Sequence, residues 1–227
     1  MTLATSLHVM ITGATGLVGQ GVLHETLLDA NVGKVTVLGR RKIDNADPRI
    51  TELIVEDFSD LSAVEDQFKG IDACLYCAGA PPIGTPEHIY RHVTVALTTS
   101  VARTLARLSP GMRFIYVSGA NANANSRFMP LRVKGEVEAA LQALALRATM
   151  LRPGGIQPAH GERSPHRALR ALYAVGAPLM GLGVALAPSL MTSTARLGRA
   201  MLAIAQMSEP PTIVENAEIN PLGQDTE

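Results

Sequence analysis

The chain has 227 residues, its twenty Lys and Arg are balanced by twenty Asp and Glu, and only 4% of its residues are aromatic. A neutral chain with few aromatic side chains lacks the positive footprint and the stacking surfaces of nucleic-acid-binding proteins, so we expect no nucleic-acid partner. Two cysteines exclude a disulfide scaffold, and the first seven residues contain no basic residue that would open a secretory signal, so we expect a cytoplasmic protein.

Short apolar runs alternate along the chain with segments of helical spacing. We predict strands over residues 7–12, 34–38, 52–55, 73–77, 113–117 and 149–152, and helices over residues 17–28, 61–68, 86–108 and 131–146. After Gly155 the pattern weakens: residues 157–165 are predicted to form a loop, two or three helices follow, and residues 213–215 are a candidate last strand. Strands that alternate with helices predict an α/β fold with a doubly wound parallel sheet.

A glycine-rich segment joins the first predicted strand to the first predicted helix, with the spacing G-x-x-G-x-x-G. Glycines there let the backbone turn sharply and approach a pyrophosphate, and the helix N-terminus offers free N–H groups to its oxygens. The position in a first βα turn favours a dinucleotide site over a tight turn without a ligand. The residues expected to contact the cofactor are Gly13, Ala14, Thr15, Gly16, Leu17 and Val18, which Gly19 follows.

Two arginines follow the second predicted strand, where an acidic residue would bind the ribose 2′-hydroxyl of NAD. The planar guanidinium groups of Arg40 and Arg41 suit a phosphate, so we expect NADP as the cofactor and NAD as the less favoured one. A solvated surface pair is the alternative. Two further segments at strand ends are expected to contact the cofactor, namely Asp57 and Phe58 beside the adenine, and Cys77, Ala78 and Gly79 where the backbone passes close to it.

Together these segments resemble a known family. The motifs are GATGLVG, LGRR, the Asp57-Phe58 pair and CAGA, and above all RVKGEVE at residues 132–138 followed by LRPG at residues 151–154. They are similar to the atypical short-chain dehydrogenases/reductases, and more closely to the branch similar to the human Tat-interacting protein of 30 kDa. The resemblance implies an NADP-binding Rossmann fold, with Pro153, Gly154 and Gly155 also at the cofactor. Without a linker or an internal repeat, we expect one NAD(P)-binding domain over residues 1–227, in which residues 157–212 form most of a small, mostly helical substrate lobe.

The resemblance also implies a catalytic set, and one member of it is missing from this chain. Ser118, at the end of the fifth predicted strand, matches the serine that polarises the substrate carbonyl, and Lys134 matches the lysine that holds the nicotinamide ribose. The family's tyrosine, which transfers the proton on the substrate oxygen, would stand four residues before the lysine, where this chain has Pro130. Proline offers no side-chain donor or acceptor.

Several groups remain open as substitutes for that tyrosine. Tyr116, Tyr90 and Lys134 itself are candidate proton donors, and Asn121, Asn123 and Asn125 are candidates for binding a substrate oxygen, although turn residues are the favoured interpretation of these asparagines. We therefore expect an NADP-dependent oxidoreductase that acts on a small, largely apolar carbonyl or alcohol. The alternative is a non-catalytic NADP-binding sensor or partner-binding protein, because Pro130 occupies the catalytic position.

Two pairs of residues resemble known sites without satisfying their requirements. Cys74 and Cys77 lie three apart in a predicted strand, so they point to opposite faces and are expected to be core cysteines. His88 and His92 share a helix face but no third ligand stands near them, so we expect no metal site.

The region after the sixth predicted strand leaves more alternatives open. His160 and His166 lie in a loop that would overhang the substrate, and exposed side chains are the default interpretation. Residues 171–195 carry no charge, and lobe core is favoured for them over an apolar substrate wall, a dimer surface or contact with a membrane. We expect a monomer or a homodimer that binds a small molecule.

Overall fold

The computed structural model describes residues 6–163, 187 and 189–224. Within these residues, seven parallel strands form one sheet in the order β3-β2-β1-β4-β5-β6-β9. Their bounds are β1 Leu7–Thr12, β2 Val32–Gly39, β3 Ile50–Ile54, β4 Ala73–Tyr76, β5 Arg113–Val117, β6 Arg147–Arg152 and β9 Ile213–Glu215. The strand order reverses beside β1, because β2 and β3 lie on one side of it and β4 lies on the other. Ligands of doubly wound sheets bind at this switch point, outside the carboxyl ends of the strands.

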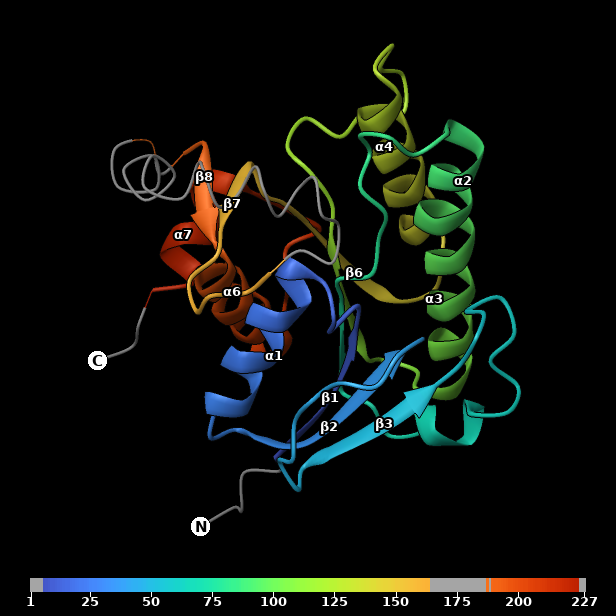
Figure 1. Ribbon diagram of the computed structural model, residues 1–227, viewed down its shortest axis with the longest axis vertical. Coiled ribbons are helices and arrows are strands. Elements are labelled where there is room, and N and C mark those ends of the chain that lie inside the picture. Colours follow the sequence, from blue (N-terminus) through green and yellow to red (C-terminus); the bar gives the residue numbers. More distant parts are fainter. Residues whose placement is uncertain (1–5, 164–186, 188, 225–227) are drawn as a thin grey trace.

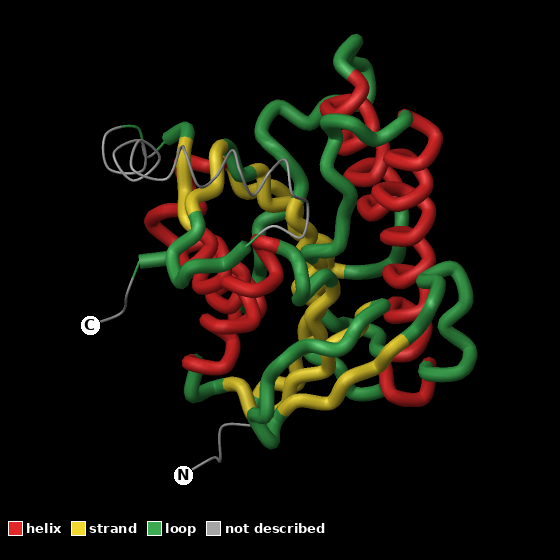
Figure 2. The backbone as a smooth tube through the Cα atoms, in the orientation of Figure 1, coloured by secondary structure: helices red, strands yellow, loops and turns green. Residues whose placement is uncertain are grey.

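Two groups of helices cover the two faces of the sheet (Figure 1). One group consists of α1 Leu17–Leu28, α6 Thr194–Gln206 and α7 Asn216–Leu222, and the other of α2 Glu87–Arg91, α3 Thr98–Leu108 and α4 Met129–Gln142. Figure 2 shows the strands between these two groups. The doubly wound parallel sheet predicted from the sequence is therefore confirmed.

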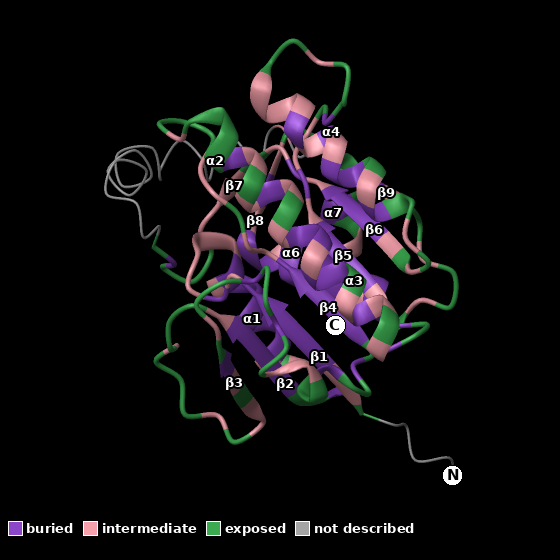
Figure 3. Ribbon diagram, turned by 90° about the vertical axis from the view of Figure 1, so that its right-hand side faces the viewer, coloured by how far each residue is buried: buried purple, intermediate pink, exposed green. Residues whose placement is uncertain are grey.

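Each face of the sheet has its own hydrophobic core, because successive side chains of a strand point to opposite faces. In β1, Val9 and Ile11 pack with residues of α1 and α6, whereas Met10 packs with residues of α3 and α4. Figure 3 shows the central strands buried along most of their length. Burial on both faces explains why the strands are continuous apolar runs in the sequence.

Three predicted helices differ from the observed ones. The helix predicted over residues 61–68 is reduced to the 3-10 turn η1 Glu65–Phe68, and the Asp60 carboxylate accepts the backbone N–H of Ser62 in a local turn before it. The helix predicted over residues 86–108 contains a π-helical segment, η2 His92–Leu97, between α2 and α3. The helix predicted over residues 131–146 is observed as α4 Met129–Gln142, and β6 begins at Arg147, two residues earlier than the predicted strand.

The C-terminal part contains two strands that the sequence did not predict. Strands β7 Gly155–Gln157 and β8 Met191–Ser193 form a separate two-stranded parallel sheet. Helix α6 falls within residues 157–212, the range expected to form the substrate lobe, yet it contributes Leu197 and Met201 to the core that α1 shares. The last strand, predicted at residues 213–215, is confirmed as β9 and pairs with β6.

Most of the uncharged stretch, residues 171–186 and 188, lies outside the described residues, as does His166. The end of this stretch is described: Met191–Ser193 form β8, and α6 begins at Thr194. Among the helices in the described part of the chain, none is both long enough and apolar enough to span a bilayer.

Candidate functional site

The glycine-rich segment forms a tight loop between β1 and α1, packed against the end of β4. Gly13 has φ +72°, a conformation that favours glycine, and a Cβ atom on it would lie 2.6 Å from the backbone nitrogen of Ala78. The Gly16 N–H donates to the Gly13 carbonyl oxygen at 2.9 Å, and a Cβ on Gly19 would lie 2.1 Å from that same oxygen. The spacing of the three glycines is therefore explained by close backbone contacts at the switch point.

A cavity of about 530 Å³ opens at this edge of the sheet. It brings together most residues that the sequence assigned to the cofactor: Gly13, Ala14, Thr15, Gly16, Arg40, Arg41, Asp57, Phe58, Cys77, Ala78 and Gly79. The other lining residues were not predicted from the sequence and are Val37, Gly39, Ile43, Glu56, Tyr76, His92, Val93 and Leu97. Glu56 and Tyr76 are adjacent in the sequence to Asp57 and Cys77, which were predicted. Extending the predicted segments after β3 and at the end of β4 by one residue would therefore have included them.

The last three missed residues come from the π-helical segment η2. Such segments insert an extra residue into a helical turn and often occur at functional sites. The sequence shows only a continuous helical pattern between residues 86 and 108, which explains why these three residues were not predicted.

Arg40 and Arg41 are exposed at the end of β2 and line the cavity together with the acidic residues Glu56 and Asp57. The hydrogen bonds from Ser59 hold the pKa of the Asp57 carboxyl below its usual value, and the charges of His92 and Arg40 act in the same direction. In the described part of the chain, neither arginine forms an ion pair within 4.0 Å. Their guanidinium groups are therefore accessible to a phosphate.

The remaining residues expected at the cofactor do not line this cavity. Leu17 and Val18 form the first turn of α1, where Val18 packs against the core. The segment Pro153–Gly155 instead contacts other parts of the chain: the Gly154 N–H donates to Asn216 at 2.9 Å, and the Gly155 N–H donates to the Leu190 carbonyl oxygen at 3.0 Å. A Cβ on Gly154 would lie 2.0 Å from that same oxygen, so this glycine is required by a close backbone approach.

Ser118 follows β5 and is buried in a polar cluster with α4 and β6. Its hydroxyl donates to the Glu138 carboxylate at 2.5 Å. The Arg152 guanidinium donates to both oxygens of that carboxylate, at 3.1 and 2.6 Å, and these hydrogen bonds raise the pKa of Arg152. Because the Ser118 proton points at Glu138, donation to a substrate carbonyl requires this hydrogen bond to break.

Lys134 lies on α4 and directs its ammonium group toward β5. Nζ donates to the Tyr116 hydroxyl at 2.8 Å and to the Val117 carbonyl oxygen at 2.9 Å, and it lies 4.6 Å from the centroid of the Tyr116 ring. Burial lowers the pKa of Lys134 to about 8, because the charged form is poorly solvated there. Burial also raises the pKa of Tyr116 far above its usual value, so this phenol stays protonated.

The other positions considered for proton transfer or substrate binding lie on α4, on α2 and in the turn after Ser118. Pro130 is in the first turn of α4, and Tyr90 is buried in α2. The asparagines after Ser118 belong to a turn: Asn121 has φ +60°, and the Asn123 side chain accepts the Asn125 N–H at 2.9 Å. The interpretation of these asparagines as turn residues is the one that the local geometry supports.

The cysteine and histidine pairs have separate surroundings. Cys74 is buried in the core, whereas Cys77 lines the cavity, and burial raises the pKa of the Cys77 thiol to about 12. His88 and His92 do not gather a third metal ligand among the described residues, whereas His160 lies against α1 and pairs with Glu25 at 2.7 Å.

Comparison with known proteins agrees with this geometry. Residues 13–171 match the model of the NAD(P)H-binding family. The protein HTATIP2 of Rattus norvegicus is 32% identical over 150 residues, which are 64% of this chain and 61% of that protein. The mitochondrial protein FMP52 of Eremothecium gossypii is 34% identical over 164 residues, which are 70% of each chain. A further match, to the leucinostatins biosynthesis cluster protein T of Purpureocillium lilacinum, spans only 42% of that relative's length.

A solved structure shares the fold at low sequence identity. The protein MoeE5, in complex with UDP-glucuronic acid and NAD, has a TM-score of 0.68 and 17% identity, and the match covers 91% of this chain and 74% of that one. The FMP52 relative is named as mitochondrial, so it does not support the expectation of a cytoplasmic location. The match to the family model over residues 13–171, together with the doubly wound fold, shows that the chain belongs to the NAD(P)H-binding family and is related to the atypical short-chain dehydrogenases/reductases.

Proposed function

We propose that the protein is an NADP-dependent oxidoreductase that acts on a small, largely apolar carbonyl or alcohol. The observation that carries this proposal is the single cavity lined by the glycine loop and by Arg40 and Arg41. The loop offers backbone N–H groups to a pyrophosphate, and the arginines offer planar donors to the 2′-phosphate that distinguishes NADP from NAD. Glycine-loop residues, Asp57, Phe58 and the segment Cys77–Gly79 would hold the rest of the nucleotide.

A bound nicotinamide would supply or accept the hydride. A residue of the chain must then donate the proton to the substrate oxygen or remove it. We assign this role to Lys134, because a pKa of about 8 lies near the pH at which a general acid works best. Ser118 is assigned to orient the same oxygen after its hydroxyl leaves Glu138. Lys134 would also contact the nicotinamide ribose, which requires its ammonium to turn away from Val117.

A second candidate function is a non-catalytic NADP-binding sensor or partner-binding protein. Pro130 favours this function, because it removes the family's proton donor from the first turn of α4. The internal hydrogen bonds of Ser118 and Lys134 favour it too, because both side chains are occupied before any substrate arrives.

The domain organisation, oligomeric state, location and partners of the protein are also proposals. We propose one domain over residues 1–227 with residues 157–212 as most of the substrate lobe, and a monomer or homodimer in the cytoplasm without a nucleic-acid partner.

Calorimetric titration of NADPH and NADH tests the choice of cofactor. Hydrogen bonds to charged groups contribute roughly 1.5–3 kcal/mol each, so we expect NADPH to bind about tenfold or more tightly than NADH. The double variant Arg40→Ala/Arg41→Ala should lose this preference, whereas Lys42→Ala, which removes an adjacent exposed cation outside the cavity lining, should keep it. Equal affinities in the unmodified protein would contradict the assignment of NADP.

Turnover distinguishes the two candidate functions. A panel of apolar aldehydes, ketones and alcohols is incubated with the protein and NADPH or NADP, and the absorbance of the reduced nicotinamide is followed. An oxidoreductase changes this absorbance with at least one member of the panel. Tight NADPH binding without turnover on the whole panel would favour the sensor.

A further inference from the structure

A group of two histidines and a glutamate lies outside the cofactor cavity. His24 and Glu25 are on α1, and His160 is in the loop after β7, 135 residues beyond Glu25. One ligand atom of each side chain lies within 4.8 Å of the ligand atoms of the other two. We propose that these three residues bind a divalent transition metal ion, with Zn²⁺ as the best-suited ion, and so link α1 to the loop after β7.

The donor set fits that chemistry. Two imidazoles and one carboxylate, with a further position open, form a common ligand set for zinc, at distances of about 2.0–2.2 Å from the metal. The His160 Nε2 atom lies 2.7 Å from Glu25 Oε1, and the rings of His24 and His160 have centroids 4.0 Å apart. The hydrogen bond between His160 and Glu25 occupies the space that an ion would take, so metal binding would replace this hydrogen bond.

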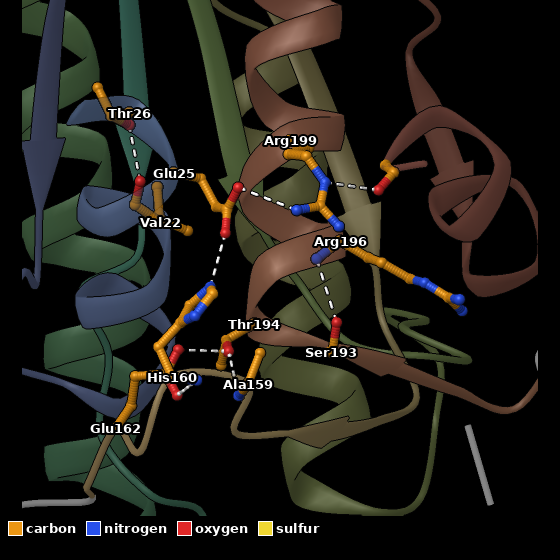
Figure 4. A network of polar contacts seen from close by, with 11 residues as sticks. Val22, Glu25, Thr26, Ala159, His160, Glu162, Ser193, Thr194, Arg196 and Arg199 are labelled. Atoms are coloured by element: carbon orange, nitrogen blue, oxygen red, sulfur yellow. Dashed lines mark hydrogen bonds and ion pairs between the residues drawn. The ribbon is translucent and has the colours of Figure 1, made fainter. Parts of the chain in front are cut away.

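The carboxylate is held in place by residues behind it (Figure 4). Glu25 is only 4% exposed, and Arg199 Nη1 donates to Glu25 Oε2 at 3.1 Å, which leaves Oε1 directed at His160. A Cβ on Gly198 would lie 3.0 Å from Cβ and Cγ of Glu25, so this glycine leaves room for the aliphatic part of that side chain. Partners of this kind orient metal ligands. Because Arg199 offsets part of the Glu25 charge, we expect it to weaken the affinity for a cation.

The loop that carries His160 is anchored by a second buried carboxylate. Glu162 accepts the His160 backbone N–H at 2.8 Å and the Thr194 hydroxyl at 2.5 Å. The Thr194 hydroxyl oxygen in turn accepts the Ala159 N–H at 3.0 Å. A Cβ on Gly21 would lie 2.5 Å from Glu162, so α1 leaves room for this carboxylate as well. The loop is therefore held against α1 and α6 before a metal binds.

The outer side of the group is open to solvent. His24 is exposed, and the His160 side chain is 34% exposed. None of the three residues lines the cofactor cavity, so metal binding and nucleotide binding can be measured separately. The sequence predicted no metal site because it placed only His88 and His92 near each other, whereas the ligands proposed here come together only in the fold.

Titration of ZnCl₂ into the full, untagged chain after removal of metals with a chelator tests the proposal. Calorimetry should give one ion per chain, and His24→Ala and His160→Ala should each weaken binding by about tenfold or more. His88→Ala is the matched control, because it removes an exposed histidine of α2 and breaks the alternative pair with His92. CoCl₂ in place of zinc should give visible absorption bands that both histidine variants lose.

Three outcomes would overturn the site: no binding by the unmodified chain, unchanged binding by His24→Ala, or loss of binding in His88→Ala. Far-UV circular dichroism shows whether each variant is folded. If His160→Ala fails to fold, His24→Ala decides the question, because the exposed His24 side chain is not needed for the core. Zinc should also raise the melting temperature of the unmodified chain and of His88→Ala, but not that of His24→Ala.

Discussion

The cavity beside β1 and the polar cluster between β5 and α4 both lie at carboxyl ends of the parallel strands, but their polar groups have different partners. In the cavity, Arg40 and Arg41 are exposed and form no ion pair within the described residues. In the cluster, the Ser118 hydroxyl donates to Glu138, and the Lys134 ammonium donates to Tyr116 and Val117. The first region is ready to accept a charged ligand, whereas the second must break internal hydrogen bonds before its groups can act.

For the proposed oxidoreductase, this difference predicts that substitutions can change nucleotide binding and turnover separately. Substitutions in the cavity should act on the affinity for the nucleotide. Substitutions of Ser118 and Glu138 in the cluster should act on stability and on the chemical step, with little effect on nucleotide affinity. Lys134, which is also proposed to contact the ribose, should affect both properties. The following experiments test whether the two regions differ in this way.

The largest effect is expected for Glu138→Ala, measured by urea unfolding. The Glu138 side chain is 5% exposed and accepts hydrogen bonds from Ser118 and Arg152, so its loss leaves a partly buried cation with fewer partners. Removing one member of a buried ion pair costs about 3–5 kcal/mol of the free energy of unfolding. Glu65→Ala is the control, because Glu65 pairs with Arg107 on the surface and its loss should cost no more than about 1 kcal/mol.

Equal losses for the two variants would contradict the difference between the regions, because Glu138 would then behave like a surface residue. NADPH affinity gives a second measurement. It should be nearly unchanged in any folded Glu138→Ala protein, since Glu138 does not line the cavity.

The next effect concerns Lys134 and the pH dependence of carbonyl reduction. The pKa of Lys134 is lowered to about 8, so the ammonium form, which is the proposed proton donor, is present below this pH and is lost as the pH rises through it. The rate of carbonyl reduction by NADPH should therefore fall above about pH 8. Lys134→Arg keeps a positive charge over this range, so the fall near pH 8 should disappear, while the rate at pH 7 should drop about 100-fold because arginine is a poor acid.

An unchanged pH profile in Lys134→Arg would show that Lys134 does not transfer the proton. The Michaelis constant for NADPH separates the two roles given to this residue. A rise in that constant without a change in the pH profile would indicate a contact with the ribose and no proton transfer.

The sequence predicted the sheet and most of the cavity because both depend on local signals. No knowledge of contacts between distant residues is needed to recognise the continuous apolar strands, the glycine spacing and the two arginines after β2. The π-helical segment that adds His92 to the cavity cannot be recognised from the sequence, because its residues have ordinary helical spacing. The hydrogen bonds of Ser118 to Glu138 and of Lys134 to Tyr116 were not predicted. Each one joins α4 to the end of β5, and the sequence pattern does not show how a helix is oriented against a strand.

The smallest effect is expected for Pro130→Tyr, which restores the family's tyrosine one helical turn before Lys134. Residues four apart on a helix share a face, so the introduced phenol would lie on the same side of α4 as Lys134. Loss of the proline from the first helical turn should cost no more than about 1 kcal/mol of stability. If the missing hydroxyl alone limits catalysis, turnover should rise severalfold, with NADPH affinity unchanged. If Lys134 remains bonded to Tyr116 and Val117, the new hydroxyl gains no ammonium partner and turnover stays the same, which would place the limit in the cluster's internal hydrogen bonds rather than at position 130.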